Sequence, residues 1–205
     1  MKNNMIRAAS ALLLTFAASL LSSCATTKST VSTARNLSSV YVTNTNTIKV
    51  LSPEYMDAEI DCVYVFSADF GEQNLSTLAY LYSDSEGMEM LLLSDFGIEI
   101  GHLNYDGKSV DLALPVKAPI KGEYIVADLQ NIFYPEQCLA ENYASAGLTF
   151  KSTTLEDGSV IRTVSKKDRT VEKITMKLDE DGNPESVVLE NLLRGYTYRL
   201  TLADE

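Results

Sequence analysis

Apolar and polar residues alternate with period two along most of this chain. The alternation is clearest at residues 60–70, where every second side chain is apolar, and it is typical of a half-buried β-strand. Turn dipeptides such as Asp106-Gly107 and Asp181-Gly182 separate the segments that share this pattern. The predicted strands are 60–70, 75–82, 88–93, 98–105, 109–114, 148–155, 160–165, 171–178, 185–191 and 196–202, and a further one is expected near residue 47.

Between the two sets of strands the apolar period changes to that of a helix. Pro115 breaks the strand pattern, and a shorter helix at 138–146 is expected to end before Gly147. Pro135 either ends the first helix or begins the second, because proline is tolerated in a first turn. Strands on both sides of a helical pair predict an α+β fold with an antiparallel sheet of about eleven strands. The apolar face of the first helix consists of Ile125, Leu129, Ile132 and Phe133.

The N-terminus has the form of a secretory signal. Lys2 and Arg7 precede an apolar run at 11–21, which suits a signal of about 7–15 residues and is shorter than the roughly 20 residues of a membrane span. The run ends on the string LSSC, which resembles the lipobox of bacterial lipoproteins. The resemblance implies that residues 1–23 are removed and that Cys24 becomes the lipidated first residue. The alternative is an ordinary signal peptide with an incidental cysteine.

Residues 24–40 are rich in serine and threonine and predict a flexible tether with a root-mean-square span of roughly 20 Å. The folded domain is then expected at 41–205. Two or more acyl chains on Cys24 would hold the protein on a membrane, since a single chain binds only reversibly. By analogy with proteobacterial lipoproteins, the absence of aspartate after Cys24 favours the outer membrane. We therefore expect a lipid-anchored protein of the bacterial cell envelope, facing the periplasm.

The charge of the chain excludes nucleic acid as a partner. Twenty-eight acidic residues against 17 Lys and Arg give a net charge of −11, and removal of the signal with Lys2 and Arg7 makes it more negative. Binding to phosphates requires the opposite sign. Attachment to an anionic membrane would likewise depend on the lipid anchor.

Two cysteines, Cys62 and Cys138, remain after the lipobox. An oxidising envelope permits a disulfide between them. Two free thiols that pack as small apolar side chains are the favoured alternative, because both residues fall on apolar phases.

Two segments, ADLQNIFYP at 127–135 and VVLENLLRGYTYRLTL at 187–202, carry a family resemblance. They are similar to a family of bacterial outer-membrane lipoproteins found near aryl-polyene and fatty-acid-type synthesis genes. The element order resembles the periplasmic lipoprotein carriers LolA and LolB. That resemblance implies a curved, half-open β-barrel with a helical lid over an apolar interior. The chain lacks the family's tryptophan before proline, and no apolar loop like that of LolB is evident. The motif residues are Asp128, Gln130, Tyr134, Pro135, Gly195 and Tyr196.

The implied fold points to a ligand cavity under the helices, although the same apolar residues could form a plain core. Asp128 and Gln130 lie beside the apolar stripe of the first helix. They could form a polar latch between lid and barrel or contact a head group, or they could satisfy backbone groups. The predicted cavity residues are Tyr64, Phe66, Ile125, Leu129, Ile132, Phe133 and Met176.

Motifs of catalysis, metal binding or cofactor binding are missing from the sequence. The single histidine, His102, shares a strand face with Ile98 and Ile100 and is interpreted as structural. The acidic string at 179–185 lacks the spacing of a calcium loop and predicts a solvated hairpin turn. The leading hypothesis is a non-catalytic lipoprotein that binds or shuttles a lipid, an acyl chain or an acylated protein, with no cofactor. The alternatives are an adaptor that binds envelope proteins and, less favoured, a hydrolase centred on His102.

Overall fold

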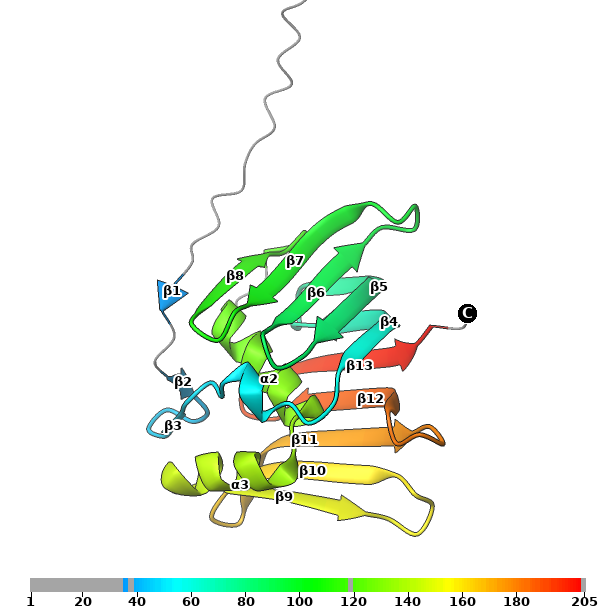
Figure 1. Ribbon diagram of the computed structural model, residues 1–205. Helices are drawn as coiled ribbons and strands as arrows, with labels where there is room; N and C mark the ends of the chain where they lie inside the picture. The colour runs from blue at the N-terminus through cyan, green and yellow to red at the C-terminus, as the bar shows by residue number, and fades with distance from the viewer. Residues whose placement is uncertain (1–34, 37–38, 118–119, 204–205) are drawn as a thin grey trace, which may run out of the picture. The chain divides into compact units, whose positions relative to one another are not determined.

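The computed structural model describes residues 35–36, 39–117 and 120–203 (Figure 1). The predicted signal peptide, Cys24 and most of the predicted tether lie outside the described residues. Within the described ranges, none of the helices has the length and apolar character needed to cross a membrane.

One antiparallel sheet of eleven strands dominates the fold, in the linear order β1-β8-β7-β6-β5-β4-β13-β12-β11-β10-β9. Two consecutive meanders form its halves and meet where β4 pairs with β13. The sheet is therefore open, with β1 and β9 as its edges, and the predicted α+β class with a curved antiparallel sheet is confirmed. The strands are β1 Arg35–Asn36, β4 Ile60–Asp69, β5 Asn74–Ser83, β6 Met88–Leu93, β7 Glu99–Tyr105, β8 Ser109–Ala113, β9 Thr149–Thr154, β10 Val160–Lys166, β11 Arg169–Leu178, β12 Pro184–Asn191 and β13 Tyr196–Leu202.

Helices α2 (Gly122–Phe133) and α3 (Glu136–Ser145) connect the two meanders. The chain leaves the sheet at β8, beside one edge, and re-enters at β9, the opposite edge, so the connection must cross a face. Helix α2 lies across that face, and α3 lies beside β9 (Figure 1). Pro135 is the N-cap residue of α3, which decides between the two predicted roles of this proline.

Alternate side chains of the strands point toward the helices and form the core. In β4, for example, Tyr64, Phe66 and Ala68 are buried while Val63 and Val65 are exposed, as period-two alternation requires. Aromatic and aliphatic residues of β5, β6, β7, β11, β12 and β13 continue this layer: Ala79, Leu81, Met88, Met90, Leu92, Leu103, Tyr105, Ile174, Met176, Val187, Leu189, Tyr198 and Leu200.

The chain before β4 forms a further layer over the helices. We call residues 39–59 the strap; it contains the short strands β2 (Val40–Tyr41) and β3 (Thr47–Ile48) and a 3-10 turn at Pro53–Tyr55. Figure 1 shows it in front of α2. Val40 is only 3% exposed, and β1 pairs with β8. The folded region therefore begins before the predicted boundary at residue 41.

Two side-chain amides hold the strap on the helices. Gln130 of α2 accepts a hydrogen bond from the Leu51 N–H at 3.0 Å and donates to the Leu51 carbonyl at 2.8 Å. Asn142 of α3 makes the same pair of bonds with Lys49, at 3.3 and 2.7 Å. These bonds pair backbone groups of the strap with the helices, and the Leu51 carbonyl also accepts from the Tyr105 hydroxyl at 2.8 Å. Helix α2 is thus an inner layer between sheet and strap and is buried on nearly all sides, whereas α3 keeps an exposed face.

A half-buried arginine caps the end of α2. Nη1 of Arg162, from β10, donates to the carbonyls of Asn131, Ile132 and Tyr134, each at 2.9 Å. Carbonyls in the last turn of a helix have no partner within the helix, and they favour a nearby positive charge. Burial lowers the pKa of Arg162, although the nearby Glu136 acts in the opposite direction.

Three smaller features agree with the sequence-based interpretation. Cys62 and Cys138 are free, half-buried thiols. Asp179 accepts hydrogen bonds from the backbone of Asp181 and Asn183 in the β11–β12 hairpin, which is the predicted solvated turn. His102 lies on the outer face of β7.

Candidate functional site

A cleft of about 420 Å³ opens beside the N-terminal end of helix α2. We call it the aromatic cleft. It combines aromatic and aliphatic walls with two positively charged side chains, and its volume falls within the roughly 300–1,000 Å³ of small-molecule pockets. Its lining residues are Phe70, Ile120, Lys121, Tyr124, Arg194, Gly195 and Tyr196.

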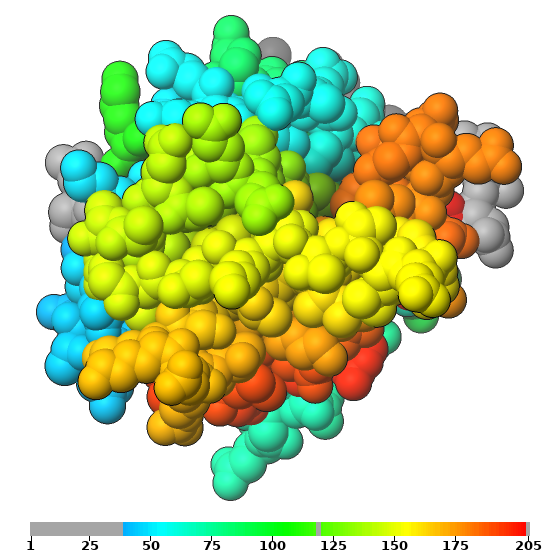
Figure 2. Space-filling model, turned by 90° about the horizontal axis from the view of Figure 1, so that it is seen from below, coloured from blue at the N-terminus to red at the C-terminus, as the bar shows by residue number. Residues whose placement is uncertain are grey.

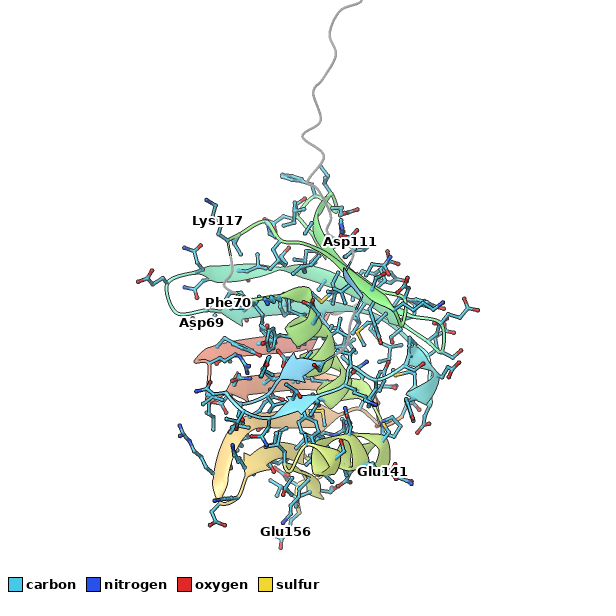
Figure 3. The ribbon with its side chains drawn as sticks, turned by 90° about the vertical axis from the view of Figure 1, so that its left-hand side faces the viewer. Asp69, Phe70, Asp111, Lys117, Glu141 and Glu156 are labelled. Carbon is cyan, nitrogen blue, oxygen red and sulfur yellow. The ribbon has the colours of Figure 1, made fainter. Side chains whose placement is uncertain are left out.

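The pairing of β4 with β13 places the aromatic wall. Asp69 pairs with Thr197, so Phe70 comes directly after the last paired residue of β4, next to the start of β13. The ring of Phe70 lies 6.2 Å from that of Tyr196 and 6.0 Å from that of Tyr198. Figure 3 shows Phe70 beside helix α2. Three aromatic side chains therefore form a continuous apolar surface at this end of the sheet.

Arg194 reaches the cleft from the β12–β13 turn. Gly195 follows it with a φ of +72°, a left-handed conformation that side chains other than glycine rarely adopt. The Arg194 guanidinium carbon lies 4.5 Å from the centre of the Tyr124 ring, in a cation–π contact. The same guanidinium donates to the carbonyls of Tyr41 and Val42, which fixes it against the strap.

Lys121 and Arg194 carry the positive charge of the cleft. Among the described residues, the ion pairs within 4 Å are those of His102 with Glu99 and Asp111, so neither cation of the cleft has a carboxylate partner at that distance. This is unusual in a chain whose net charge is −11. The described lining of the cleft also contains no acidic side chain.

A buried polar network lies behind the cleft and shares Tyr196 with it. The Tyr196 hydroxyl donates to Asp128 Oδ2 at 2.7 Å and lies 3.1 Å from Asn191 Nδ2. Glu172 accepts hydrogen bonds from Asn131 at 2.8 Å and from Asn191 at 3.1 Å. Asp128 and Glu172 are 4% and 5% exposed, so α2 places two carboxyl groups together within the core.

The two carboxyl groups do not ionise independently. Burial, and then the charge of Glu172, raise the pKa of Asp128 well above its usual value. Burial also raises the pKa of Glu172, but its amide donors and a hydrogen bond with Asp128 oppose that shift. We therefore assign the proton of the pair to Asp128, which donates it to the Glu172 carboxylate. Burial and the charge of Asp128 likewise raise the pKa of Tyr196.

A second region of clefts lies at the C-terminal end of α2, and we call it the distal cleft. Two adjoining hollows of about 320 and 250 Å³ share Glu59, Ile60, Phe133, Asn183 and Pro184 in their walls. In Figure 2 the strap, the end of α2 and strands β9 to β12 meet on this face. The walls carry three acidic residues, Asp57, Glu59 and Asp61, and the cation Arg162.

The structure divides the predicted cavity residues between two environments. Four of them, Tyr64, Ile132, Phe133 and Met176, line the distal cleft. The other three, Phe66, Ile125 and Leu129, are buried in the core, where the ring of Phe66 lies 5.9 Å from that of Tyr198. None of the seven lines the aromatic cleft.

The predicted latch residues also have different partners. Asp128 connects α2 to the sheet through Tyr196. Gln130 instead holds the strap through Leu51. A latch that opens and closes stays a prediction for Asp128, whereas the contacts of Gln130 match the alternative in which it satisfies backbone groups.

Sequence reasoning missed Glu172 and Asn191, although a signal for both was present. Glu172 falls on the same strand phase as Ile174 and Met176, and Asn191 on that of Val187 and Leu189. A charged or amide side chain on an otherwise apolar phase indicates a buried polar site. Lys121 and Arg194 gave no comparable signal, because surface positions commonly carry such residues.

An apolar hairpin tip was also missed. Phe96, in the β6–β7 turn, is 90% exposed, and Ile98 is 64% exposed. The hairpin projects from the body of the molecule in Figure 1. The string SDFGIEI contained the signal, since an aromatic residue within a turn has no apolar layer to pack into.

His102 lies far from a catalytic arrangement. Nδ1 lies 2.9 Å from Glu99 and Nε2 lies 3.5 Å from Asp111, on the outer face of the sheet. The described neighbours of the ring are thus carboxylates, and the structural role of this histidine stays a prediction.

Comparison with protein families identifies one match. A family described as "Protein of unknown function (DUF3261)" matches residues 65–204. The chain belongs to this family. Its description names no catalytic activity, and the matched region runs from the middle of β4 to the end of β13 and includes both helices.

Curated proteins give no match to the chain. Among solved structures, a crystal structure of MucB aligns with a TM-score of 0.39 and 14% identity, over 75% of this chain and 54% of that one. The structure of the MucA/MucB complex of Pseudomonas aeruginosa gives 0.36 and 15%, over 75% and 53%. This chain spans about half the length of those structures.

Proposed function

We propose that this chain is a membrane-anchored, non-catalytic lipoprotein that binds a hydrophobic ligand of the acyl-chain class in the aromatic cleft. The observation that carries the proposal is the cleft itself, about 420 Å³ with walls from Phe70, Ile120, Tyr124 and Tyr196. The ligand site proposed here therefore lies at the N-terminal end of α2 and differs from the predicted cavity under the helices. The distal cleft is less suitable for chains that end in an acid, because its walls carry Asp57, Glu59 and Asp61 and its cation Arg162 is bonded to backbone carbonyls.

Apolar burial would supply the affinity. Each methylene removed from water contributes about 0.8 kcal/mol, so a chain with ten buried methylenes gains roughly 8 kcal/mol. Association costs of about 4 kcal/mol or more reduce this gain. The net gain from the chain alone is then about 4 kcal/mol or less, a dissociation constant of about 1 mM, which suits a carrier that must also release its ligand.

Two further features support a location of this protein at a membrane surface. The predicted lipidation of Cys24 would anchor the chain there. The β6–β7 tip exposes Phe96 and Ile98, side chains that can enter the interface of a bilayer. Changing Cys24 to Ala should move the protein from the membrane fraction to the soluble fraction. Unchanged membrane association of Cys24→Ala would contradict lipidation as the anchor.

A tryptophan reporter tests the cleft directly, because the chain contains no tryptophan. Tyr124→Trp places the fluorophore in the cleft, and Leu155→Trp places a control in the exposed β9–β10 turn. Dibrominated acyl chains quench tryptophan on contact, and they are offered both as the free acid and as a glycerol ester. Saturable quenching of the Tyr124→Trp protein alone supports the proposal. Equal, non-saturating quenching of both proteins would exclude acyl binding in this cleft.

An adaptor that binds another envelope protein is the second candidate, and the exposed hairpin tip is the observation that favours it. In that case a single stoichiometric partner should be captured by the chain and lost from Phe96→Ser, while the Tyr124→Trp reporter stays silent. Capture that does not depend on Phe96 would remove the hairpin as the basis for this candidate.

A further inference from the structure

The aromatic cleft has a charge pattern that its apolar walls do not require. Lys121 is the N-cap residue of α2 and Arg194 lies over the Tyr124 ring, and both line the cleft. Neither has a carboxylate within 4 Å among the described residues. By contrast, the lining of the distal cleft carries Asp57 and Glu59, and its described cation, Arg162, is bonded to carbonyls at the end of α2. The aromatic cleft is therefore the end of α2 that favours an anion.

We propose that the aromatic cleft selects a single-chain fatty acid, with its carboxylate between Lys121 and Arg194 and its chain along Phe70, Tyr124 and Tyr196. This inference rests on the proposed function, and it adds the chemical class of the head group. Both cations line the same cleft as the apolar surface, so one amphipathic molecule can contact both at once.

The donors of Arg194 suit a carboxylate. The guanidinium has five N–H donors, and the bonds to the Tyr41 and Val42 carbonyls use a donor on each terminal nitrogen. The remaining N–H groups are available to a planar anion, which is the acceptor that a guanidinium binds best. The cation–π contact with Tyr124 holds the group in place before a ligand arrives.

The lining and the volume of the cleft indicate which head group and how many acyl chains the ligand has. A zwitterionic phospholipid would bring its ammonium group close to Lys121 and Arg194, and the described lining of the cleft contains no acidic side chain to offset that repulsion. The volume of about 420 Å³ is near the lower end of the range for ligand pockets, which favours one chain over two.

Calorimetric titration with four dodecyl compounds below their critical micelle concentrations tests the inference. The compounds are dodecanoate, monododecanoylglycerol, dodecanoyl-lysophosphatidylcholine and dodecyltrimethylammonium. The protein is the chain from residue 25 onward, which contains the whole described domain. We expect dodecanoate to bind about tenfold more tightly than the neutral glycerol ester, and the cation to bind most weakly. Raising the salt from about 0.02 to 0.5 M should reduce this preference severalfold, because the cations are solvent-exposed.

Substitutions of Lys121 and Arg194 test whether these cations cause the preference for dodecanoate over the glycerol ester. Lys121→Met should weaken dodecanoate binding about fivefold or more and leave the glycerol ester unchanged. Lys108→Met, an exposed lysine elsewhere, is the control for net charge and should leave both affinities unchanged. Arg194→Lys keeps the charge without the planar donors and should give an intermediate loss. A circular dichroism melt of each variant shows that the fold is retained.

The outcomes separate this inference from the proposed function. If the glycerol ester and dodecanoate bind equally, or lysophosphatidylcholine binds best, the cleft holds acyl chains but the carboxylate assignment is wrong. An unchanged dodecanoate affinity in Lys121→Met with a retained fold overturns the role of that lysine. If none of the four compounds binds, both the proposed function and the inferred preference for a fatty acid are wrong.

Discussion

The buried pair of Asp128 and Glu172 makes the stability of this domain depend on pH in an unusual direction. The folded state raises the pKa of Asp128 well above its unfolded value, first through burial and then through the charge of Glu172. A raised pKa contributes stability that is fully present below the unfolded pKa and is lost as pH rises through the folded pKa. The free energy of unfolding should therefore fall between pH 5 and pH 7.

The magnitude follows from proton linkage. Each proton that the folded state retains and the unfolded state has lost changes the free energy of unfolding by about 1.4 kcal/mol per pH unit. One retained proton on Asp128 thus costs up to about 2.7 kcal/mol between pH 5 and pH 7. Asp106 and Asp179 have lowered pKa values from backbone hydrogen bonds, so their contribution is lost only at more acidic pH.

Two amide substitutions locate the proton. Asp128→Asn stays neutral at every pH, can still accept from the Tyr196 hydroxyl, and can donate to Glu172. This variant should lose most of the dependence of the free energy of unfolding on pH, and it should be more stable than the unchanged protein at pH 7. Glu172→Gln should instead lose about 1–3 kcal/mol, because its NH₂ group would face the amide donors of Asn131 and Asn191.

Urea unfolding followed by circular dichroism at pH 5, 6, 7 and 8 measures these effects, with equal m-values as the check on a two-state comparison. Asp181→Asn, at an exposed position in the β11–β12 turn, is the matched control and should keep the slope. A slope in Asp128→Asn equal to that of the unchanged protein would refute the assignment of the proton, as would a stabilising Glu172→Gln.

Three further substitutions test the supports of the site. Gln130→Ala removes a hydrogen-bond partner from the N–H and carbonyl of Leu51 and should lower the free energy of unfolding in urea by about 1–3 kcal/mol. The control Gln137→Ala, at an exposed position, should change it by no more than about 0.5 kcal/mol. Equal losses in the two variants would show that this contact of the strap does not stabilise the fold. Arg162→Met removes three hydrogen bonds from the end of α2 and should cost about 2–4 kcal/mol, and a loss below 1 kcal/mol would mean that water replaces the guanidinium. Phe96→Ser should leave stability unchanged and reduce binding of the domain to vesicles, measured by sedimentation; unchanged binding would exclude the hairpin as a membrane contact.

Much of the sheet could be predicted from the sequence because it obeys local rules. Period-two alternation and turn dipeptides placed the ten longer strands, since each strand buries one face against the helices. The stripe of α2 was equally visible at 125–133. Both patterns depend only on residues that are close in the chain.

The site depended on contacts between distant residues, and those could not be predicted in the same way. The strap joins Leu51 to Gln130, and the aromatic cleft joins Phe70 to Arg194, in each case through long-range packing. The cover that residues 39–59 form over α2 could not be predicted, because no local pattern shows that this segment folds back over the helices. Glu172 was the exception, since its strand phase alone indicated a buried charge.

Photocrosslinking with a diazirine fatty acid, followed by peptide mass spectrometry, tests the central claim most directly. The reaction marks whatever side chains the bound acyl chain contacts. We predict saturable labelling on peptides that contain Phe70, Tyr124 or Tyr196, competed by unlabelled dodecanoate. Labelling that is confined to the distal cleft around Ile60 and Phe133, or that competition does not reduce, would contradict acyl binding at the N-terminal end of α2.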